Sequence, residues 1–440
     1  MDKSIKVIPF RQRRICLRHR VAIRRLLPII FIIISIGNYL LAEIKITDID
    51  NKVFDGCLIK FEDDRAVISS ENSTPISFTY NNIAGITFSS AITASTLKTE
   101  TDYFRIVFAN QDVLYGTISD TGKDSFVINN SLIGKVVINF EQLSLIERAE
   151  DNKQLSIQIR SSEVRQADKQ DNIFLVSGDT DSGVVISLTP ETIILKSSLY
   201  NKERLYKIKE IKAVSFFSPA VRGRDKIISP TLRTMVYLVD NSQLSGSIIR
   251  SDSSKQNSQV FLSTGKTAYS IPIDVINFIY FRNNRCVYLS DIEPVEVKEY
   301  IVSPDDLMNT FLWHYQKDRS IFSGQPLSLN GKKHFKGLSV HANCELRYKL
   351  DNSYQRFFAT IGLDDESSMG QSEDFEGSVK FIVYLDGQKV YESDTFKRTV
   401  NSADISINVK GGNELRLVVN DAGDGYILDR AAWVSAYLTK

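Results

Sequence analysis

A glycine followed by a short apolar segment recurs four times before residue 290, and this recurrence limits the possible fold more than any other feature. The glycines lie about 60 to 67 residues apart, at Gly56, Gly116, Gly183 and Gly246. Segments rich in Val, Ile, Leu and Phe flank each of them, with Asp, Asn, Gly or Ser in the turns. Short β-branched and aromatic segments separated by turn residues predict strands, and their recurrence predicts tandem all-β units.

The four small β units are predicted at residues 43–92, 102–149, 171–218 and 232–289, with a polar linker over 150–170. In rhythm they resemble small Sm-like and SH3-like barrels, which implies a bent sheet of roughly five strands whose closure removes the exposed edges. A glycine inside a strand is typical of the sharp bend that such a barrel needs. The alternative is that these glycines are hairpin residues in one longer β-array.

Residues 1–42 combine a basic run with an apolar run. They contain nine Lys and Arg side chains and one acid, and the apolar run begins at Leu26 and ends at Ala42. This layout predicts a secretory signal peptide cut before Glu43, so we expect an exported protein of the periplasm, the cell surface or the medium. The alternative is an uncleaved anchor, which alone would bring the chain to a membrane, but the apolar run is shorter than the ~20 residues of a comfortable span.

The remainder of the chain is acidic. Removing nine basic and one acidic residue from totals of 54 and 53 leaves 45 against 52, a net charge of −7. Nucleic-acid phosphates are bound by clustered Lys and Arg, so we do not expect a nucleic-acid partner.

Beyond Phe311 the pattern changes to alternating apolar strands separated by polar turns. Val379, Phe381, Val383 and Leu385 fall on one face of such a strand, and Asp386 with the following glycine is a hairpin signal. About 140 residues of this kind without an amphipathic helix predict a jelly-roll β-sandwich, which we place at 299–440.

Five blocks in this region carry a family resemblance. They are Lys336-Gly-Leu-Ser-Val-His-Ala342, Ile361-Gly-Leu-Asp-Asp-Glu366, Tyr384-Leu-Asp-Gly-Gln-Lys-Val-Tyr391, Leu415-Arg-Leu-Val-Val-Asn-Asp-Ala-Gly-Asp-Gly425 and Asp429-Arg-Ala-Ala-Trp433. In this order they resemble the NPCBM family of carbohydrate-binding modules, found beside glycoside hydrolases that include family 98. The resemblance implies a galactose-binding-like jelly roll whose loops at one end hold a sugar. The family usually has Asp-His-Ala-Asp-Trp in the last block, so an imidazole and a carboxylate are missing here.

The candidate sugar contacts are His341, Asp364, Asp365 and Trp433. A sugar site needs a few convergent polar groups and commonly an aromatic face. Each candidate has a plainer alternative: His341 as a structural histidine, the two aspartates as turn caps or calcium ligands, and Trp433 as a core residue.

Asp421 and Asp424 lie in a tight acidic turn whose oxygens suit a structural calcium ion, which would be the only cofactor that we expect. The alternative is that this turn binds nothing. The sequence contains no GxSxG, HExxH or phosphate-loop motif and four histidines in all, so we expect no catalytic residues and no enzyme. Cys57, Cys286 and Cys344 are far apart and odd in number, which favours free thiols over a disulfide framework or a zinc site.

Two functions from different classes remain. In the first, an exported, non-catalytic protein attaches to a glycan or polysaccharide through its C-terminal jelly roll. In the second, the β units contact other proteins of the cell envelope and the chain serves as an assembly scaffold. Fold alone does not choose between them, because function depends on the site.

The signal segment makes a prediction of its own. N-terminal sequencing of the exported protein should begin at or near Glu43, because the small residue before it ends the apolar run. A mature protein that keeps Met1 in the cytosol would contradict this expectation.

Overall fold

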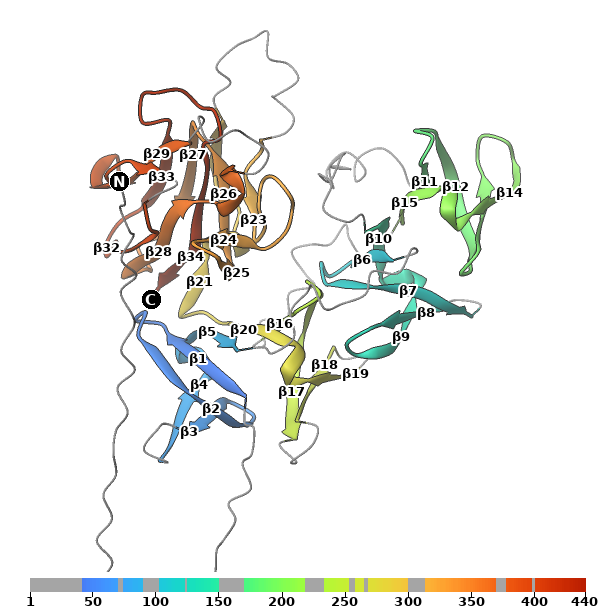
Figure 1. Ribbon diagram of the computed structural model, residues 1–440, viewed down its shortest axis with the longest axis horizontal. Coiled ribbons are helices and arrows are strands. Elements are labelled where there is room, and N and C mark those ends of the chain that lie inside the picture. Colours follow the sequence, from blue (N-terminus) through green and yellow to red (C-terminus); the bar gives the residue numbers. More distant parts are fainter. Residues whose placement is uncertain are drawn as a thin grey trace, which may run out of the picture. The chain divides into compact units, whose positions relative to one another are not determined.

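The computed structural model describes residues 42–69, 74–89, 103–122, 125–149, 170–217, 233–252, 258–264, 268–299, 313–368, 377–397 and 400–440. Most of the predicted signal segment and of the predicted linker at 150–170 lies outside these ranges. Strands and short 3-10 helices make up the regular structure, which confirms the all-β prediction (Figure 1). In this part of the chain no helix is long and apolar enough to cross a membrane.

Four five-stranded units occupy the chain before residue 283. The first contains β1 (Glu43–Asp48), β2 (Val53–Phe61), β3 (Arg65–Ser69), β4 (Pro75–Thr79) and β5 (Ile83–Phe88). The second contains β6 (Phe104–Phe108), β7 (Val113–Thr121), β8 (Ser125–Asn130), β9 (Gly134–Asn139) and β10 (Leu143–Arg148). The third contains β11 (Asp171–Leu175), β12 (Thr180–Leu188), β13 (Thr192–Ser197), β14 (Lys202–Lys207) and β15 (Ile211–Ser215). The fourth contains β16 (Arg233–Leu238), β17 (Gln243–Asp252), β18 (Gln259–Ser263), β19 (Ala268–Pro272) and β20 (Ile276–Arg282).

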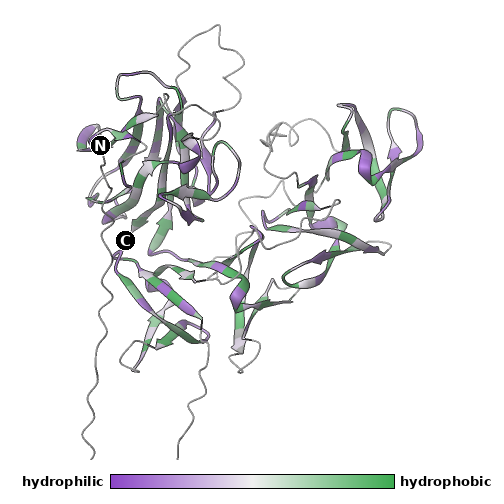
Figure 2. Cartoon of the chain, viewed as in Figure 1, coloured by the Kyte–Doolittle hydropathy of each residue, from purple (hydrophilic) through white to green (hydrophobic). Residues whose placement is uncertain are grey.

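Each unit has the same strand order, with its fifth strand beside the first and its second, third and fourth strands following. A 3-10 helix joins the fourth strand to the fifth, as at Tyr80–Asn82 in the first unit. Apolar and polar residues alternate along these strands (Figure 2), and the apolar ones form one continuous core cluster.

The recurring glycines lie where the second strand bends against the third. A Cβ atom on Gly183 would lie 2.1 Å from the Lys196 carbonyl oxygen, and one on Gly246 would lie 2.4 Å from that of Ser263. The ladder register shifts two residues after each glycine, for example between Ile248 and Arg250. A side chain has no room at this close approach, which explains why glycine recurs there.

Closure within a unit does not cover the outer edge of its fifth strand. In the first unit β5 pairs with β1 and β4 pairs with β3. Another unit covers the fifth strand instead: β5 pairs with β20 through Ile86 and Ile279, and β10 pairs with β15 through Ile146 and Val214. Each of these residues is the fourth of its strand, so equivalent positions meet across a local pseudo-twofold axis. Units two and four also pair, through Val113 and Gln243.

The C-terminal region is a two-sheet sandwich, as predicted. One sheet has the order β23 (Gln316–Lys317), β26 (Gly337–His341), β34 (Arg430–Thr439), β28 (Arg356–Leu363) and β32 (Ala403–Asn408), with β21 (Cys286–Tyr288) also on β34. The other has the order β22 (Glu296–Glu299), β27 (Cys344–Lys349), β33 (Glu414–Asn420), β29 (Ser378–Leu385) and β30 (Gln388–Glu392), with β31 (Phe396–Lys397) on β29. A separate hairpin joins β24 (Leu327–Leu329) to β25 (Lys332–His334).

The sandwich begins earlier than the predicted boundary at residue 299. β21 lies inside the range assigned to the fourth unit, 232–289, yet it pairs with β34, and β22 pairs with β27. The sandwich therefore begins at Cys286, about thirteen residues before the predicted boundary. The sequence did not show this, because local residue patterns cannot tell which distant strand a short segment will join.

The three cysteines inside the described ranges, Cys57, Cys286 and Cys344, are free thiols, as predicted. Cys286 and Cys344 are buried, and burial raises the pKa of both thiols. Neither is therefore a reactive thiolate at neutral pH.

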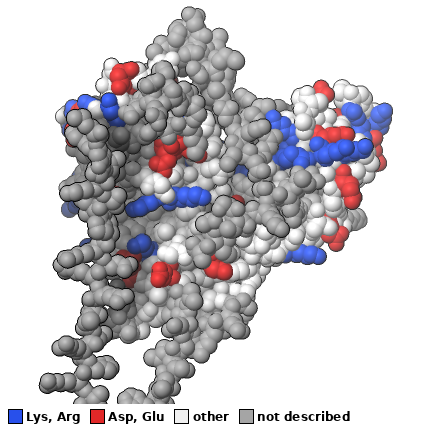
Figure 3. All heavy atoms as spheres, in the orientation of Figure 1, with Lys and Arg blue, Asp and Glu red and all other residues white. Residues whose placement is uncertain are grey.

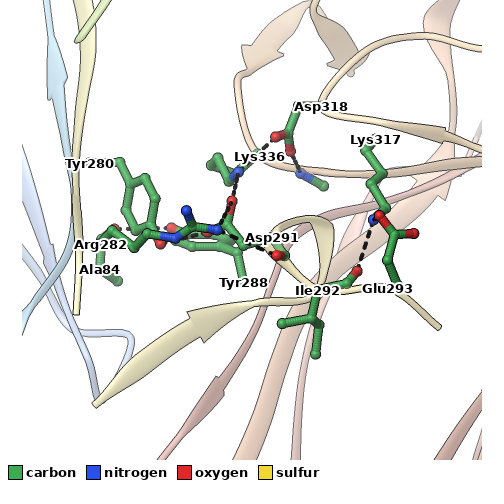
Figure 4. A network of polar contacts seen from close by, with 11 residues as sticks. Ala84, Tyr280, Arg282, Tyr288, Asp291, Ile292, Glu293, Lys317, Asp318 and Lys336 are labelled. Carbon is green, nitrogen blue, oxygen red and sulfur yellow. Dashed lines mark hydrogen bonds and ion pairs between the residues drawn. The ribbon is translucent and has the colours of Figure 1, made fainter. Parts of the chain in front are cut away.

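A buried ion cluster connects the fourth unit, the segment after it and the sandwich (Figure 4). The Lys336 side chain is 3% exposed, and its Nζ lies 2.8 Å from Asp291 Oδ1 and 2.6 Å from Asp318 Oδ2. The Tyr280 hydroxyl donates to Asp291 Oδ2, and Nζ also lies 5.3 Å from the Tyr280 ring centroid and 5.5 Å from that of Tyr288. Charged and aromatic partners thus surround the ammonium group.

The cluster keeps its charges. Burial alone would lower the pKa of Lys336, but Asp291 and Asp318 raise it above its usual range. Burial alone would raise the pKa of Asp291, but Lys336 and Arg282 hold it below its usual range. Both partners therefore remain ionised at neutral pH.

Replacing Lys336 by Met should destabilise the protein by about 3–5 kcal/mol, because it leaves the Asp291 and Asp318 carboxylates without their buried cation. Denaturant unfolding of the full chain measures this change. Lys349→Met is the matched control, since Lys349 pairs with Asp351 at an exposed site and should matter by less than about 1 kcal/mol. Equal losses in the two variants would contradict the prediction.

Candidate functional site

The ends of three adjacent strands meet at one edge of the sandwich. β26 ends at His341, which pairs with Arg430, the first residue of β34. β28 ends at Leu363, which pairs with Ala431. The loops that follow or precede these strands therefore lie next to one another, and they contain most of the polar residues predicted from the family resemblance.

Four half-buried aromatic rings gather at this edge: Trp313, Phe322, His341 and Tyr426, which we name the aromatic cluster. The Trp313 ring centroid lies 5.0 Å from that of His341 and 6.4 Å from that of Phe322, with the two larger rings nearly parallel. The His341 and Tyr426 centroids lie 6.4 Å apart. Partly exposed rings of this kind offer flat apolar faces beside polar loops.

Arg430 lies against the aromatic cluster. Its guanidinium carbon is 4.0 Å from the Phe322 ring centroid and 4.8 Å from that of Trp313, and the residue is 6% exposed. Nη1 donates to the Glu366 carbonyl oxygen at 2.7 Å, whereas the buried Nε has no hydrogen-bond partner. Burial lowers the pKa of Arg430, and the neighbouring Asp364 and Glu366 oppose that shift. The group stays charged, because an arginine keeps its proton in proteins.

His341 is positioned as a hydrogen-bond acceptor. Its Nδ1 lies 2.7 Å from the Ala342 carbonyl oxygen, which can only accept, so Nδ1 carries a proton. Burial lowers the pKa of the imidazole, with Arg430 acting in the same direction. The ring is therefore neutral at neutral pH, with Nε2 left as the acceptor.

Asp364 is buried beside these groups and is 1% exposed. Its Oδ1 accepts the Glu366 backbone N–H at 3.0 Å, and its Oδ2 has no partner. Burial raises the pKa of this carboxyl to about 7. Perturbed carboxyls of this kind concentrate at functional sites, although they also occur in purely structural networks.

Asp365 lies one residue further on but has a different role. Its oxygens accept the backbone N–H groups of Asn330 and Gly331, each at 2.8 Å, and the Ser328 hydroxyl. These contacts hold the turn of the β24–β25 hairpin. They correspond to the turn-capping alternative that the sequence left open.

The structure contradicts the prediction that Trp433 contacts a sugar. It is 1% exposed and packs edge-on against Phe381 at 4.9 Å between ring centroids, inside the core of the sandwich. A tryptophan that stacks on a sugar needs an exposed face, so Trp433 cannot make the contact proposed for it.

The acidic turn is held by hydrogen bonds of its own. Asp421 accepts the Gly423 N–H at 3.1 Å and the Asn343 side-chain amide at 3.2 Å, and Asp424 accepts the Ser378 hydroxyl at 2.6 Å. No group of three or more His, Cys, Asp or Glu side chains suited to a metal ion occurs among the described residues. The calcium ion at Asp421 and Asp424 stays a prediction.

Sequence reasoning missed four residues of the site: Trp313, Phe322, Tyr426 and Arg430. Arg430 did carry a signal, since it stands where the family usually has histidine. Trp313 comes three residues before β23, whose antiparallel pairing with β26 carries the chain back toward His341. Phe322 and Tyr426 lie in loops, where no period marks a residue as part of a site.

With this geometry established, the comparison with known families decides the identity of the region. The family model of the NPCBM/NEW2 domain matches residues 286–439. The match confirms the resemblance found in the five blocks, and its start coincides with β21, the first strand of the sandwich. We refer to this region as the NPCBM domain.

The chain is also similar to part of a much larger protein. This relative, named "Putative endo-alpha-N-acetylgalactosaminidase", from Renibacterium salmoninarum, is 30% identical over 104 residues, which is 23% of this chain and 6% of that protein's length. The chain thus spans a small fraction of that relative.

Two solved structures are similar to the chain. CBM51 from Clostridium perfringens GH95, in complex with methyl-galactose, is 30% identical and covers 35% of this chain and 99% of its own, with a TM-score of 0.30. The tandem CBM51 modules of the family 98 glycoside hydrolase of Streptococcus pneumoniae are 14% identical and cover 65% and 92%, also with a TM-score of 0.30.

The raised pKa of Asp364 predicts a pH-dependent stability. The folded carboxyl keeps its proton up to about pH 7, whereas the ordinary value is 3.8. Its contribution to the free energy of unfolding is therefore full below the unfolded-state pKa of 3.8 and is lost as the pH rises through the folded-state pKa of about 7. We expect the free energy of unfolding of the wild type to fall more between about pH 5 and pH 8 than that of Asp364→Asn.

The comparison with the variant isolates this group. Burial lowers the pKa of His334 to about 4 and also lowers that of His341. Both lowered values make the protein more stable as the pH rises, and they do so equally in the wild type and in Asp364→Asn. Parallel pH profiles for wild type and Asp364→Asn in denaturant unfolding would contradict the prediction.

Proposed function

We propose that the NPCBM domain binds a glycan at the aromatic cluster. The observation that carries the proposal is the gathering of four half-buried rings and a free histidine acceptor at the loop edge of a domain of this family. Sugar rings have one apolar face that packs on aromatic side chains and hydroxyl groups that need hydrogen-bond partners. Trp313 would supply the packing face and His341 Nε2 an acceptor.

The proposed role is attachment without catalysis, by a protein exported through the segment at 1–42. A family of binding modules and the lack of a known catalytic motif in the sequence support it. One similar protein was solved in complex with methyl-galactose, and another, a CBM51 module of Clostridium perfringens, in complex with GlcNAc. These sugars are the first to test on this chain.

A second candidate, an assembly role through the β units, has one observation in its favour. Large apolar side chains are exposed on the third unit, among them Val184 at 58% and Leu205 at 61%. Leu205 pairs directly with Ile194, so apolar residues of neighbouring strands share this outer face. Figure 3 shows Lys, Arg, Asp and Glu side chains on the surface where β11–β15 lie in Figure 1. Exposed apolar groups within a charged surface are typical of protein contacts.

A glycan array on the purified full chain, followed by titration calorimetry, tests the first proposal. A single module should bind with an affinity on the order of micromolar to millimolar. Trp313→Ala should weaken binding by about tenfold or more, because it removes the packing face. Tyr200→Ala, an exposed aromatic of the third unit, is the control and should bind like the wild type.

The outcomes separate the alternatives. If no glycan binds at millimolar concentration, the assembly role replaces the binding role. Running each titration with calcium and with a chelator also tests the ion at Asp421 and Asp424. Equal affinity and equal melting temperature in the two buffers would contradict the calcium prediction.

A further inference from the structure

We propose that the glycan bound at the aromatic cluster is acidic, and that Arg430 binds its carboxylate or sulfate group. This inference rests on the proposed function and adds the chemical class of the ligand. It starts from a buried arginine that forms no ion pair with any described residue.

Arg430 is buried, whereas Arg319 and Arg356, which also form no ion pair with a described residue, are exposed. Arg347 pairs with Glu296 and Glu414, and Arg416 with Glu345. Within the described ranges Arg430 has no ion pair, and its polar contact is the carbonyl oxygen of Glu366. Burying a charge is costly unless it is paired, so an unpaired buried guanidinium calls for an explanation.

The two nearest acids do not neutralise it directly. The Glu366 carboxylate accepts the hydroxyls of Ser320 and Ser323, each at 2.5 Å, and thereby holds the turn that carries Phe322. Asp364 shares its Oδ1 with the Glu366 N–H, and burial raises its pKa to about 7, so it is only partly ionised near neutral pH.

The Nε edge of the guanidinium suits an anion. Nη1 is occupied, and Nε is buried with no hydrogen-bond partner. Nε and Nη2 together are the edge with which an arginine binds a carboxylate or sulfate through two parallel hydrogen bonds. The rings of Phe322 and Trp313 fix the plane of the group, which lowers the entropic cost of that contact.

The guanidinium itself points to an anion, because it is always charged and only donates hydrogen bonds. Asp421 and Asp424 lie on the loop before β34 and repel anions in general. An acidic sugar therefore binds only if its carboxylate or sulfate group lies at the guanidinium of Arg430 and away from these two aspartates.

The experiment compares galactose, galacturonic acid and galactose 6-sulfate by titration calorimetry on the full chain. At low salt we expect at least one acidic sugar to bind about tenfold or more tightly than galactose, as a charge-assisted contact does. The difference should shrink as salt is added. The two acidic sugars show whether the edge prefers carboxylate, sulfate or either.

Variants assign the effect to Arg430. Arg430→Gln should bring the ratio of acidic to neutral affinity to about one, and Arg430→Lys should keep part of it, because the charge stays but the two-bond geometry is lost. Arg416→Gln is the matched control, since Arg416 also stacks on a ring, that of Tyr384, but has Glu345 as its partner. If Arg430→Gln does not fold, the salt dependence of the wild type and the Arg430→Lys ratio decide.

Failure of this inference differs from failure of the proposed function. Galactose binding as tightly as both acidic sugars would overturn the acidic ligand and leave glycan binding intact. Acidic preference that persists in Arg430→Gln would overturn the assignment to this residue. If none of the sugars binds and the glycan array is also empty, both proposals fall.

Discussion

The buried ammonium of Lys336 between Asp291 and Asp318 is the interaction on which the arrangement around the NPCBM domain depends. The ammonium is almost completely removed from water and its carboxylate partners are largely so, and losing one charge leaves the others without their partner. The Tyr280 hydroxyl also bonds Asp291, and the Tyr288 hydroxyl bonds the Ala84 carbonyl oxygen of the first unit at 3.1 Å. Through these contacts the sandwich, the fourth unit and the first unit share one polar centre beside a small apolar cluster.

The β units solve the edge problem of bent sheets by pairing with one another. A glycine lets the second strand approach the third closely, and this bend shapes the five-stranded sheet. One edge of the fifth strand pairs with the first strand, and its outer edge then needs a partner, because an unpaired edge invites uncontrolled association. Pairing of β5 with β20 and of β10 with β15 supplies it within one chain.

The candidate site combines a rigid frame with loop residues. The paired strands β26, β34 and β28 fix His341, Arg430 and Asp364, while Trp313, Phe322 and Tyr426 come from the loops. Such a division is common in binding sites, because strands give precision and loops give variety. The Arg430 guanidinium, which forms no ion pair with a described residue, and the Asp364 carboxyl, whose pKa burial raises, both lie buried at this edge.

The sequence by itself determined the all-β class, the positions of the glycine bends and the family of the C-terminal domain. These depend on local patterns: alternation along a strand, turn residues, and ordered blocks. Only the tertiary structure decided that β21 and β22 join the sandwich, that Trp433 is core while Trp313 is at the surface, and that Asp365 caps a hairpin. Each of these depends on which segments far apart in the chain pair or pack together. Neighbouring residues carry no record of that choice, because strand pairing and burial are set by the whole fold.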